Sequence, residues 1–254
     1  MILSHMSHRN VVKLFGCCME SQLPLLVYEF VPNGTLSQHL KSCQNDLPWE
    51  RRLQIAIECA EAVAYMHHEA SQPIFYRDIK SSNILLDHTF TPKVADFGIS
   101  RLQPSNEMHL CTKSPSGTLG YEDPQFKASC QFTNKSDVYS FGVVLVELLT
   151  GKPAVMSPPE LSRDGDMYFL YDHFLSAFND NRLIQIVDPR VVSDRTLVQM
   201  KNMAQLAKAC LEMEGMARPS MREVVGELAW IRGGTRQPGI YGDVTLLERR
   251  GTSS

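Results

Sequence analysis

Two aspartates and one asparagine near the middle of the chain stand at a spacing that could support chemistry. Asp78 and Asn83 lie five positions apart in the stretch Asp-Ile-Lys-Ser-Ser-Asn, and Asp96 opens an Asp-Phe-Gly tripeptide thirteen positions later. Side-chain oxygens of Asp and Asn are ligands for hard cations such as Mg²⁺, and a carboxylate can also accept a proton. If two loops bring these side chains together, they form the catalytic half of a phosphoryl-transfer site.

The upstream sequence lacks the elements that cover nucleotide phosphates in many such sites. Neither a G-x-G-x-x-G pattern nor a Val-Ala-Ile-Lys-like strand precedes Asp78. We therefore expect the phosphate-binding half of the site to be missing from the N-terminal side of the chain.

Length and composition predict one large globular domain. The 254 residues are 43% hydrophobic and 21% charged, which is enough apolar material for a substantial core. The formal net charge is −3 and no basic stripe is visible, so we expect no nucleic-acid partner. The longest apolar run, 138–149, is shorter than the ~18 residues of a spanning helix, so we expect no membrane span.

The seven cysteines predict a reducing environment. They include the adjacent Cys17 and Cys18, lie mostly in apolar patterns and show no C-x-x-C spacing for zinc. We interpret them as reduced, buried thiols of a cytosolic protein. Cys111 is the exception, for which we expect an exposed but unreactive thiol.

Hydrophobic periodicity predicts strands at the start of the chain and helices through most of the rest. The apolar runs 11–18 and 25–31 are separated by a polar turn and predict adjacent strands. After residue 136 we expect helices joined by loops. Residues 220–223 form a capping box that opens the final helix, and the last twenty residues are expected to be a loose tail. A core-facing helical stripe is predicted for Leu53, Ile57, Ala60 and Ala64.

Four short stretches occur in the order found in eukaryotic protein kinases. They have the sequences HRNVVKL, LVYEFVPNG, KVADFG and KSDVYSFG, at residues 8–14, 26–34, 93–98 and 135–142. The chain therefore resembles the cytoplasmic kinase domain of plant receptor-like protein kinases, and most closely the wall-associated kinase-like group. The similarity covers roughly residues 1 to 232.

The resemblance implies an α+β, protein-kinase-like fold with a mainly helical C-lobe and an incomplete, small β N-lobe. Residues 1–31 would be the remnant of the N-lobe, with the end of a helix, two strands and the hinge. Residues 32–232 would form the C-lobe, and residues 233–254 a C-terminal tail. The glycine-rich loop, the strand lysine and its partner glutamate would all lie before Met1.

The resemblance also implies roles for the residues of the central loops. Asp78 would orient the substrate hydroxyl or accept its proton, and Lys80, which resembles serine/threonine kinases, would meet the transferred phosphate. Asn83 and Asp96 would bind Mg²⁺, and ATP would be the phosphate donor. The loop that carries Asp78, Lys80 and Asn83 would be the catalytic loop. Asp137, at the start of an apolar helix, would anchor this loop through hydrogen bonds to its main chain.

A nucleotide pocket is implied near the first strands. Tyr28 would be the gatekeeper residue, and Glu29 and Val31 would belong to the hinge whose main chain pairs with adenine. Leu85 would form the floor beneath the base. For these four residues, an ordinary role in the core of the strands is an alternative interpretation.

Two positions depart from the usual kinase pattern. Tyr76 replaces the histidine before Arg-Asp, so we expect it to keep the apolar stacking of that position but to lose the hydrogen bonding of an imidazole. Gln125 replaces the glutamate that usually pairs with Arg218, so we expect at best a neutral hydrogen bond between the two. A buried Arg218 would then be poorly compensated.

The loop between Asp96 and Gln125 carries hydroxyl side chains that could be phosphorylated. Arg77 would bind a phosphate added to this loop through charge-assisted hydrogen bonds. An exposed loop that is simply polar is the plainer interpretation. Thr118 resembles the residue that contacts the Asp and the Lys of the catalytic loop. The other hydroxyls are those of Thr112, Ser114 and Ser116.

Two functions remain open from the sequence. The first is a protein serine/threonine kinase domain that transfers the γ-phosphate of ATP to protein hydroxyls in receptor-like signalling, on the cytoplasmic face of the plasma membrane. The second is a truncated, pseudokinase-like fragment that binds a partner, for example a full-length kinase, without catalysis. The missing N-terminal elements favour the second. A two-stranded remnant would also expose an apolar patch formed by Leu14, Phe15, Leu25 and Val27.

Overall fold

A run of apolar residues makes α4 (Asn134–Thr150) the buried centre of the structure. The helix is apolar on nearly all sides, and a helix of this kind needs other elements around it. It begins after Thr133, which forms a capping box with Ser136, and ends at Gly151, whose φ is 67°.

The computed structural model describes residues 6–18, 20, 25–42, 47–104, 108–112, 117–156 and 167–233. Among these residues, no helix is both long and apolar enough to span a bilayer.

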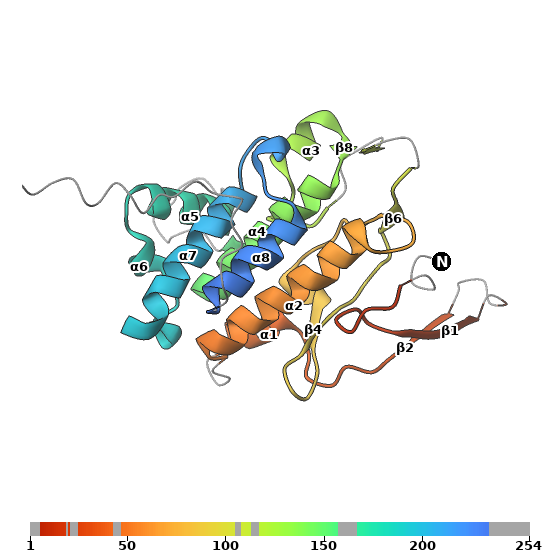
Figure 1. The fold of residues 1–254 in the computed structure, drawn as a ribbon, viewed down its shortest axis with the longest axis horizontal. Coiled ribbons are helices and arrows are strands. Elements are labelled where there is room, and N and C mark those ends of the chain that lie inside the picture. The colour runs from red at the N-terminus through yellow and green to blue at the C-terminus, as the bar shows by residue number, and fades with distance from the viewer. Residues whose placement is uncertain are drawn as a thin grey trace, which may run out of the picture.

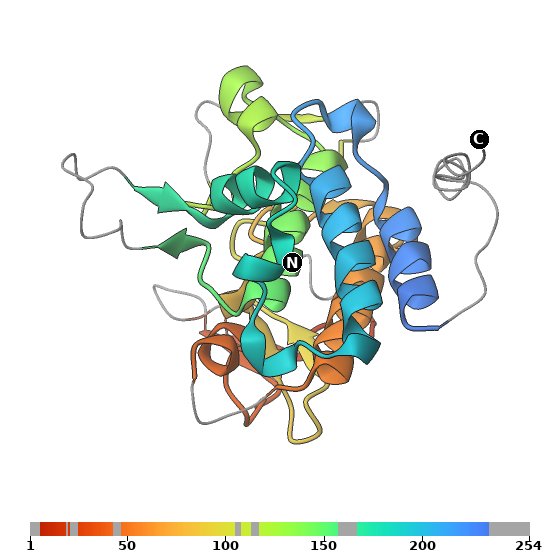
Figure 2. The same ribbon diagram turned by 90° about the vertical axis from the view of Figure 1, so that its left-hand side faces the viewer.

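Two long helices pack against α4, and a third packs on these two. The first two are α2 (Trp49–His68) and α7 (Asp194–Cys210), and the third is α8 (Met221–Ile231), which lies against α2 and α7 (Figures 1 and 2). The predicted capping box opens α8, because Ser220 and Glu223 exchange hydrogen bonds between their side chains and main-chain nitrogens. The predicted apolar stripe of α2 is also confirmed, since its four members are all buried: Leu53, Ile57, Ala60 and Ala64.

Shorter helices and strand pairs connect these long helices. The predicted α+β architecture is confirmed, but the expectation of only helices and loops after residue 136 was wrong, because two short strands pair there at one edge of the molecule (Figure 2). The shorter helices are α1 (Leu36–Lys41), α3 (Pro124–Ser129), α5 (Leu170–Asn179), α6 (Leu183–Ile186), η2 (Ser81–Asn83), η3 (Pro189–Val191) and η4 (Gly215–Ala217). The antiparallel pairs are β3 (Ile74–Phe75) with β6 (Arg101–Leu102), β4 (Ile84–Leu86) with β5 (Pro92–Val94), β7 (Leu110–Cys111) with β8 (Gln131–Phe132), and β9 (Val155–Met156) with β10 (Tyr168–Phe169).

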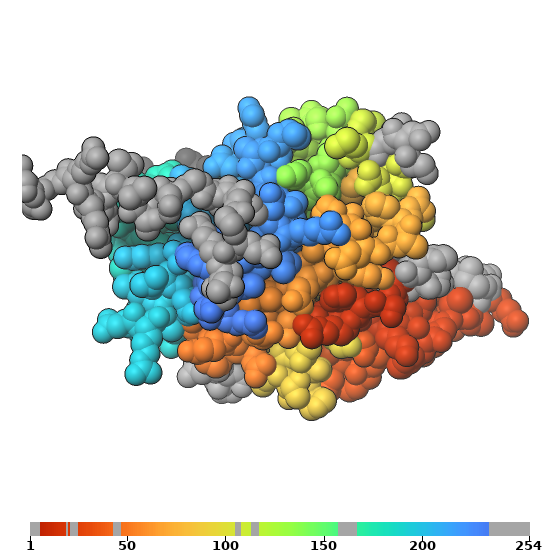
Figure 3. Space-filling model, viewed as in Figure 1, coloured from red at the N-terminus to blue at the C-terminus, as the bar shows by residue number. Residues whose placement is uncertain are grey.

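The two N-terminal strands form a separate antiparallel pair that exposes apolar side chains. β1 (Leu14–Cys18) pairs with β2 (Leu25–Tyr28), as predicted, although both strands are shorter than the apolar runs in the sequence. Phe15, Leu25 and Val27 are 63%, 60% and 56% exposed, which confirms the expected apolar patch at these positions. Leu14 instead packs against the main core, so its inclusion in the patch was wrong. The space-filling view shows this N-terminal region along one side of the helical body (Figure 3).

The cysteines are less buried than their apolar surroundings in the sequence suggested. Cys59 and Cys210 are buried, and burial raises the pKa of both thiols. Cys17 and Cys18 are exposed because β1 is open to solvent, so the prediction that they are buried was wrong. Cys111 is exposed, as expected. The six described cysteines are all free thiols.

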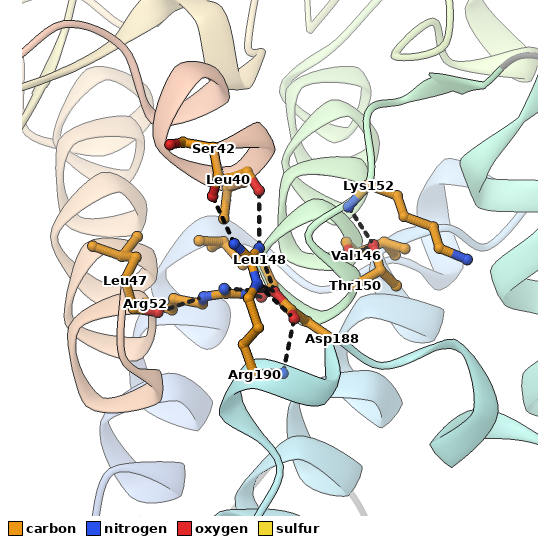
Figure 4. Close-up of polar contacts among 10 residues, drawn as sticks. All are labelled: Leu40, Ser42, Leu47, Arg52, Val146, Leu148, Thr150, Lys152, Asp188 and Arg190. Atoms are coloured by element: carbon orange, nitrogen blue, oxygen red, sulfur yellow. Dashed lines mark hydrogen bonds and ion pairs between the residues drawn. The ribbon is translucent and has the colours of Figure 1, made fainter. Parts of the chain in front are cut away.

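A buried carboxylate joins three parts of the helical body (Figure 4). Asp188, just before η3, accepts hydrogen bonds from Arg52 of α2 at 2.6 Å and from Arg190 at 2.7 Å. Arg52 also donates to the main-chain oxygen of Leu148 in α4, and Arg190 to that of Leu40 in α1. Burial alone would raise the pKa of Asp188, but the hydrogen bonds from the two arginines outweigh it and lower the pKa to about 2. The cluster therefore fixes the ends of α1, α2 and α4 to one another.

Removing this carboxylate should cost much more stability than removing an exposed one. We expect Asp188→Asn to lower the free energy of unfolding by about 3–5 kcal/mol, because it leaves the buried Arg52 without its counter-charge. Asp180→Asn is the matched control, since Asp180 forms an ion pair with Arg182 at the surface and should cost about 0–1 kcal/mol. Urea unfolding at pH 7 measures both variants. Equal losses in the two variants would contradict the structural role of Asp188.

The same cluster predicts a dependence of stability on acid. A carboxylate whose pKa is depressed on folding stabilises the protein above its ordinary pKa, and this contribution is lost as the pH falls through the folded value. Wild-type protein should therefore lose stability between about pH 4 and pH 2 relative to Asp188→Asn, as the pKa near 2 implies. Thermal unfolding of the two proteins across this range measures the difference.

Candidate active site

A buried carboxylate of α4 positions the loop that follows β3. Asp137 accepts hydrogen bonds from the main-chain nitrogens of Tyr76 at 3.0 Å and Arg77 at 2.8 Å. His67 of α2 lies 2.9 Å from the same carboxylate. Arg77 has a φ of 74°, a conformation that non-glycine residues rarely adopt, and the bonds to Asp137 hold it there. The predicted anchoring of this loop by Asp137 is confirmed.

Three side chains converge on the carboxylate of Asp78. Lys80 Nζ lies 2.6 Å and Asn83 Nδ2 2.8 Å from Asp78 Oδ2, and Thr118 Oγ1 lies 2.6 Å from Asp78 Oδ1. Lys80 Nζ also lies 3.0 Å from Thr118 Oγ1, so the predicted contact of Thr118 with both residues is confirmed. The structure thus brings together Asp78, Lys80 and Asn83 from one loop and Thr118 from another.

The main chain brings the Asp96 loop against the same site. The nitrogen of Ala95 donates to the main-chain oxygen of Asn83 at 2.9 Å, which places Asp96 directly after a contact with Asn83. Asp96 is exposed and has a φ of 59°, and its Oδ1 accepts a hydrogen bond from Gly98 at 3.2 Å. Phe97 points inward and is buried. The loop therefore exposes the Asp96 carboxylate to solvent, one residue after the main-chain contact with Asn83, and is anchored by the buried side chain of Phe97.

Tyr76 lies between the two loops. Its ring packs edge-on against Phe97 with centroids 5.1 Å apart, and its hydroxyl donates to the main-chain oxygen of Ala95. Burial first, and then the carboxylate of Asp78, raise the pKa of Tyr76 well above its usual value. The predicted stacking is confirmed. The sequence analysis did not predict the polar contact at this position, in which the phenol hydroxyl donates to a main-chain acceptor on the second loop.

Asn83 and Asp96 offer oxygen atoms suited to a hard cation. The amide nitrogen of Asn83 donates to Asp78, so its amide oxygen is the atom left to bind a cation. Mg²⁺ in nucleotide sites is commonly held by one or two protein oxygens together with phosphate oxygens and water. In the described part of the chain, no group of three or more His, Cys, Asp or Glu could hold a metal ion. The donor set therefore fits Mg²⁺ that arrives with a phosphate ligand.

The four residues expected at a nucleotide pocket lie on neighbouring segments. Tyr28 ends β2, and burial followed by the nearby Asp96 carboxylate raises its pKa. Glu29 lies 3.1 Å from Lys93 of β5, and Leu85 of β4 is the register partner of that lysine. Val31 packs at the margin of the core, before a segment that hydrogen-bonds with β4. All four keep part of their surface exposed, and their binding of a nucleotide stays a prediction.

The hydroxyl-bearing loop is described only in part. Thr112 hydrogen-bonds to the main chain of Cys130, while Ser114 and Ser116 lie outside the described residues. Arg77 is largely buried, where its guanidinium donates to the main-chain oxygen of Ile99 at 3.0 Å and stacks on a phenylalanine ring. Binding of a loop phosphate by Arg77 stays a prediction.

Comparison with known proteins identifies the family. A model of the protein tyrosine and serine/threonine kinase family matches residues 1–228. The chain belongs to this family of protein kinases. It is 49% identical to wall-associated receptor kinase-like 1 of Arabidopsis thaliana over 233 residues, which are 91% of the chain and 31% of that relative.

Other relatives from the same plant are similar over comparable lengths. Wall-associated receptor kinase-like 4 is 48% identical over 95% of the chain, and wall-associated receptor kinase 3 is 47% identical over 91%. The chain spans 31% of the length of each of these two relatives. The resemblance to the wall-associated kinase group is confirmed.

Arg218 of this kinase domain has a partner that we did not predict. Its Nη2 lies 2.6 Å from Oδ1 of Asp123, and both side chains are buried. Gln125 instead accepts a hydrogen bond from the main-chain nitrogen of Gly215 at 2.6 Å. The expectation of a poorly compensated arginine was therefore wrong, because the carboxylate two positions earlier, at the N-cap of α3, replaces the missing glutamate.

Sequence reasoning also missed a group of polar residues beneath the catalytic loop. Ser81 and Tyr121 both donate hydrogen bonds to Glu147, which is 2% exposed in the last turn of α4. One signal was available: glutamate is rarely fully buried unless it is paired, and Glu147 interrupts an apolar run. Its partners lie 66 and 26 positions away, so no local spacing reveals them.

Paired substitutions test which residue compensates Arg218. Asp123→Asn should lower the free energy of unfolding by about 3–5 kcal/mol, because it leaves a buried guanidinium without its counter-charge. Gln125→Ala removes one neutral hydrogen bond from an exposed residue and should cost about 1 kcal/mol. Chemical unfolding of both variants gives the comparison. A larger loss of unfolding free energy for Gln125→Ala than for Asp123→Asn would show that Gln125, and not Asp123, compensates Arg218.

Proposed function

We propose that this kinase domain is a serine/threonine kinase that transfers the γ-phosphate of ATP to hydroxyl groups of protein substrates. The observation that carries the proposal is the convergence of Lys80, Asn83 and Thr118 on the carboxylate of Asp78. A structural loop has no need for this combination of residue types around one carboxylate. Family membership supports the reaction class.

Asp78 is the residue that orients the acceptor hydroxyl and takes up its proton. A group in this role must be held in a fixed direction and lie within hydrogen-bond reach of its substrate. Lys80 and Thr118 each hold one of the two carboxylate oxygens, at 2.6 Å. Lys80 carries a positive charge beside Asp78, where it neutralises the transferred phosphoryl group. This lysine, two positions after the aspartate, supports serine and threonine as acceptors.

Asn83 and Asp96 are the residues that bind Mg²⁺. The bound ion neutralises charge on the phosphate oxygens and orients them for transfer. Asn83 is fixed by its hydrogen bonds to Asp78, and Asp96 by the main-chain contact between Ala95 and Asn83. The adenine base binds along the segment of Tyr28, Glu29 and Val31, above Leu85.

A second function, as a binding module, is favoured by one specific observation. The β1–β2 pair exposes the apolar side chains of Phe15, Leu25 and Val27. Apolar surface of this kind marks a site of association with another protein. In this alternative, the domain binds a partner such as a full-length kinase and does not transfer phosphate.

The names of the relatives support a setting for the reaction. Their names describe wall-associated receptor kinases, and the present chain spans about a third of their length. We propose that the domain acts in receptor-like signalling on the cytoplasmic face of the plasma membrane, where ATP is available.

Nucleotide binding and catalysis can be separated with two substitutions. At a concentration of Mg²⁺-ATP about 100-fold above Kd, the melting temperature of wild-type protein should rise by about 5–10 °C. Asp96→Ala should abolish this rise because it removes a metal ligand. Asp78→Asn should keep the rise and reduce phosphoryl transfer to a peptide by roughly 10²- to 10⁴-fold. Differential scanning fluorimetry and a radiometric peptide assay measure the two effects.

The surface variant Asp180→Asn serves as the control and should match wild type in both assays. Absence of any Mg²⁺-dependent rise in the wild-type protein would contradict the kinase proposal. A normal rise without phosphoryl transfer would favour the binding module.

A further inference from the structure

A second buried carboxylate of α4, that of Glu147, lies beneath the loop that carries Asp78 and Asn83. Oε1 of Glu147 accepts a hydrogen bond from Ser81 Oγ at 2.9 Å, and Oε2 accepts one from Tyr121 OH at 2.8 Å. The two hydroxyl oxygens are 3.2 Å apart. All three side chains are buried, so water does not compete for these bonds.

Each of the two partners of Glu147 is connected to Asp78, and each through a different segment of the chain. Ser81 directly follows Lys80, whose Nζ lies 2.6 Å from the Asp78 carboxylate. Tyr121 closes a turn by donating its main-chain nitrogen to the oxygen of Thr118 at 3.0 Å, and the hydroxyl of Thr118 lies 2.6 Å from Asp78. Glu147 therefore completes a closed ring of contacts that includes the catalytic loop and the turn 118–121.

We propose that Glu147 is a positioning residue for phosphoryl transfer: its carboxylate holds the turn 118–121 against the catalytic loop and thereby fixes the direction of Asp78. The inference rests on the proposed function, since it assigns a further residue to the same reaction. Glu147 touches neither a substrate atom nor the predicted metal ligands. It acts through Ser81 and Tyr121.

The chemistry of the ring depends on the charge of Glu147. An ionised carboxylate accepts hydrogen bonds from both hydroxyls, whereas a protonated one must use one oxygen as a donor. Burial raises the pKa of Glu147 to about 7, although the hydroxyls of Tyr121 and Ser81 oppose the shift. The main-chain nitrogen of Ala154 and the charge of Lys41 on α1 also favour the ionised form. Burial raises the pKa of Tyr121, so its hydroxyl stays protonated as a donor.

Hydrogen exchange tests the ring without any requirement for activity. Protection factors of the amides in 118–121, corrected for the intrinsic pH dependence of exchange, should fall about tenfold in wild-type protein between pH 8 and pH 6, because one strong hydrogen bond is lost. Glu147→Gln should show the lower protection at both pH values. Tyr121→Phe, which removes one contact and leaves the carboxylate in place, should also lower it.

Thr150→Val is the matched control on the same helix. Thr150 is buried and hydrogen-bonds to Val146 and Lys152 at the end of α4, as Figure 4 shows. Loss of the Thr150 hydroxyl perturbs α4 by an amount comparable to that in Glu147→Gln. It should nevertheless leave the protection of amides in 118–121, and the pH dependence of that protection, unchanged. A Glu147→Gln variant with wild-type protection at pH 8 would overturn the proposal.

Kinetics distinguishes positioning from general stability. Glu147→Gln should lower kcat about tenfold at pH 8 with an unchanged KM for ATP, and the step in kcat near pH 7 should disappear. If Glu147→Gln only lowered stability, the protein that remained folded would keep the wild-type pH profile of kcat. If wild-type protein transfers no phosphate, the proposed function fails, while hydrogen exchange still decides the role of Glu147. Unchanged kcat in a variant whose exchange has increased would overturn the positioning role.

Discussion

The contact between Asp137 and the main chain of the catalytic loop is the constraint on which the site depends. Burial of a carboxylate costs free energy unless donors compensate it, and here main-chain nitrogens of Tyr76 and Arg77 do so together with His67. These bonds maintain the positive φ of Arg77, after which the chain turns toward the site. The direction of Asp78 thus depends on the core of the protein as well as on contacts within the loop.

Helix α4 carries this constraint because it is surrounded on all sides. Its two buried carboxylates bind different kinds of donor. Asp137 accepts hydrogen bonds from main-chain nitrogens, whereas Glu147 accepts them from the side-chain hydroxyls of Ser81 and Tyr121. At the end of the same helix, Asp188 joins neighbouring helices through arginines. In each case a buried charge has donors from segments far apart in the sequence. A buried charge of this kind tolerates few alternative arrangements of those segments, because any of them would leave it unpaired.

The sequence alone was sufficient where information is local. The five-residue spacing of Asp78 and Asn83 predicts their proximity, and apolar periodicity predicts the buried face of α2. The partner of Arg218 could not be predicted, because Asp123 and Gln125 stand two positions apart and the start of α3 decides which one reaches the guanidinium. Exposure of Cys17 was missed for a related reason: burial of a strand depends on what covers it, and its own apolar pattern does not contain that information.

The convergence of Asp78, Asn83 and Asp96 on one point is the central claim, and a paramagnetic ion measures it most directly. Mn²⁺ in place of Mg²⁺, bound with a non-hydrolysable ATP analogue, broadens the NMR signals of nearby amides. The account predicts broadening that is strongest around residues 78, 83 and 96, weakens with distance from them and disappears when excess Mg²⁺ displaces the ion. Broadening centred on only one of these positions, or on another part of the chain, would show that the three side chains do not share a cation site.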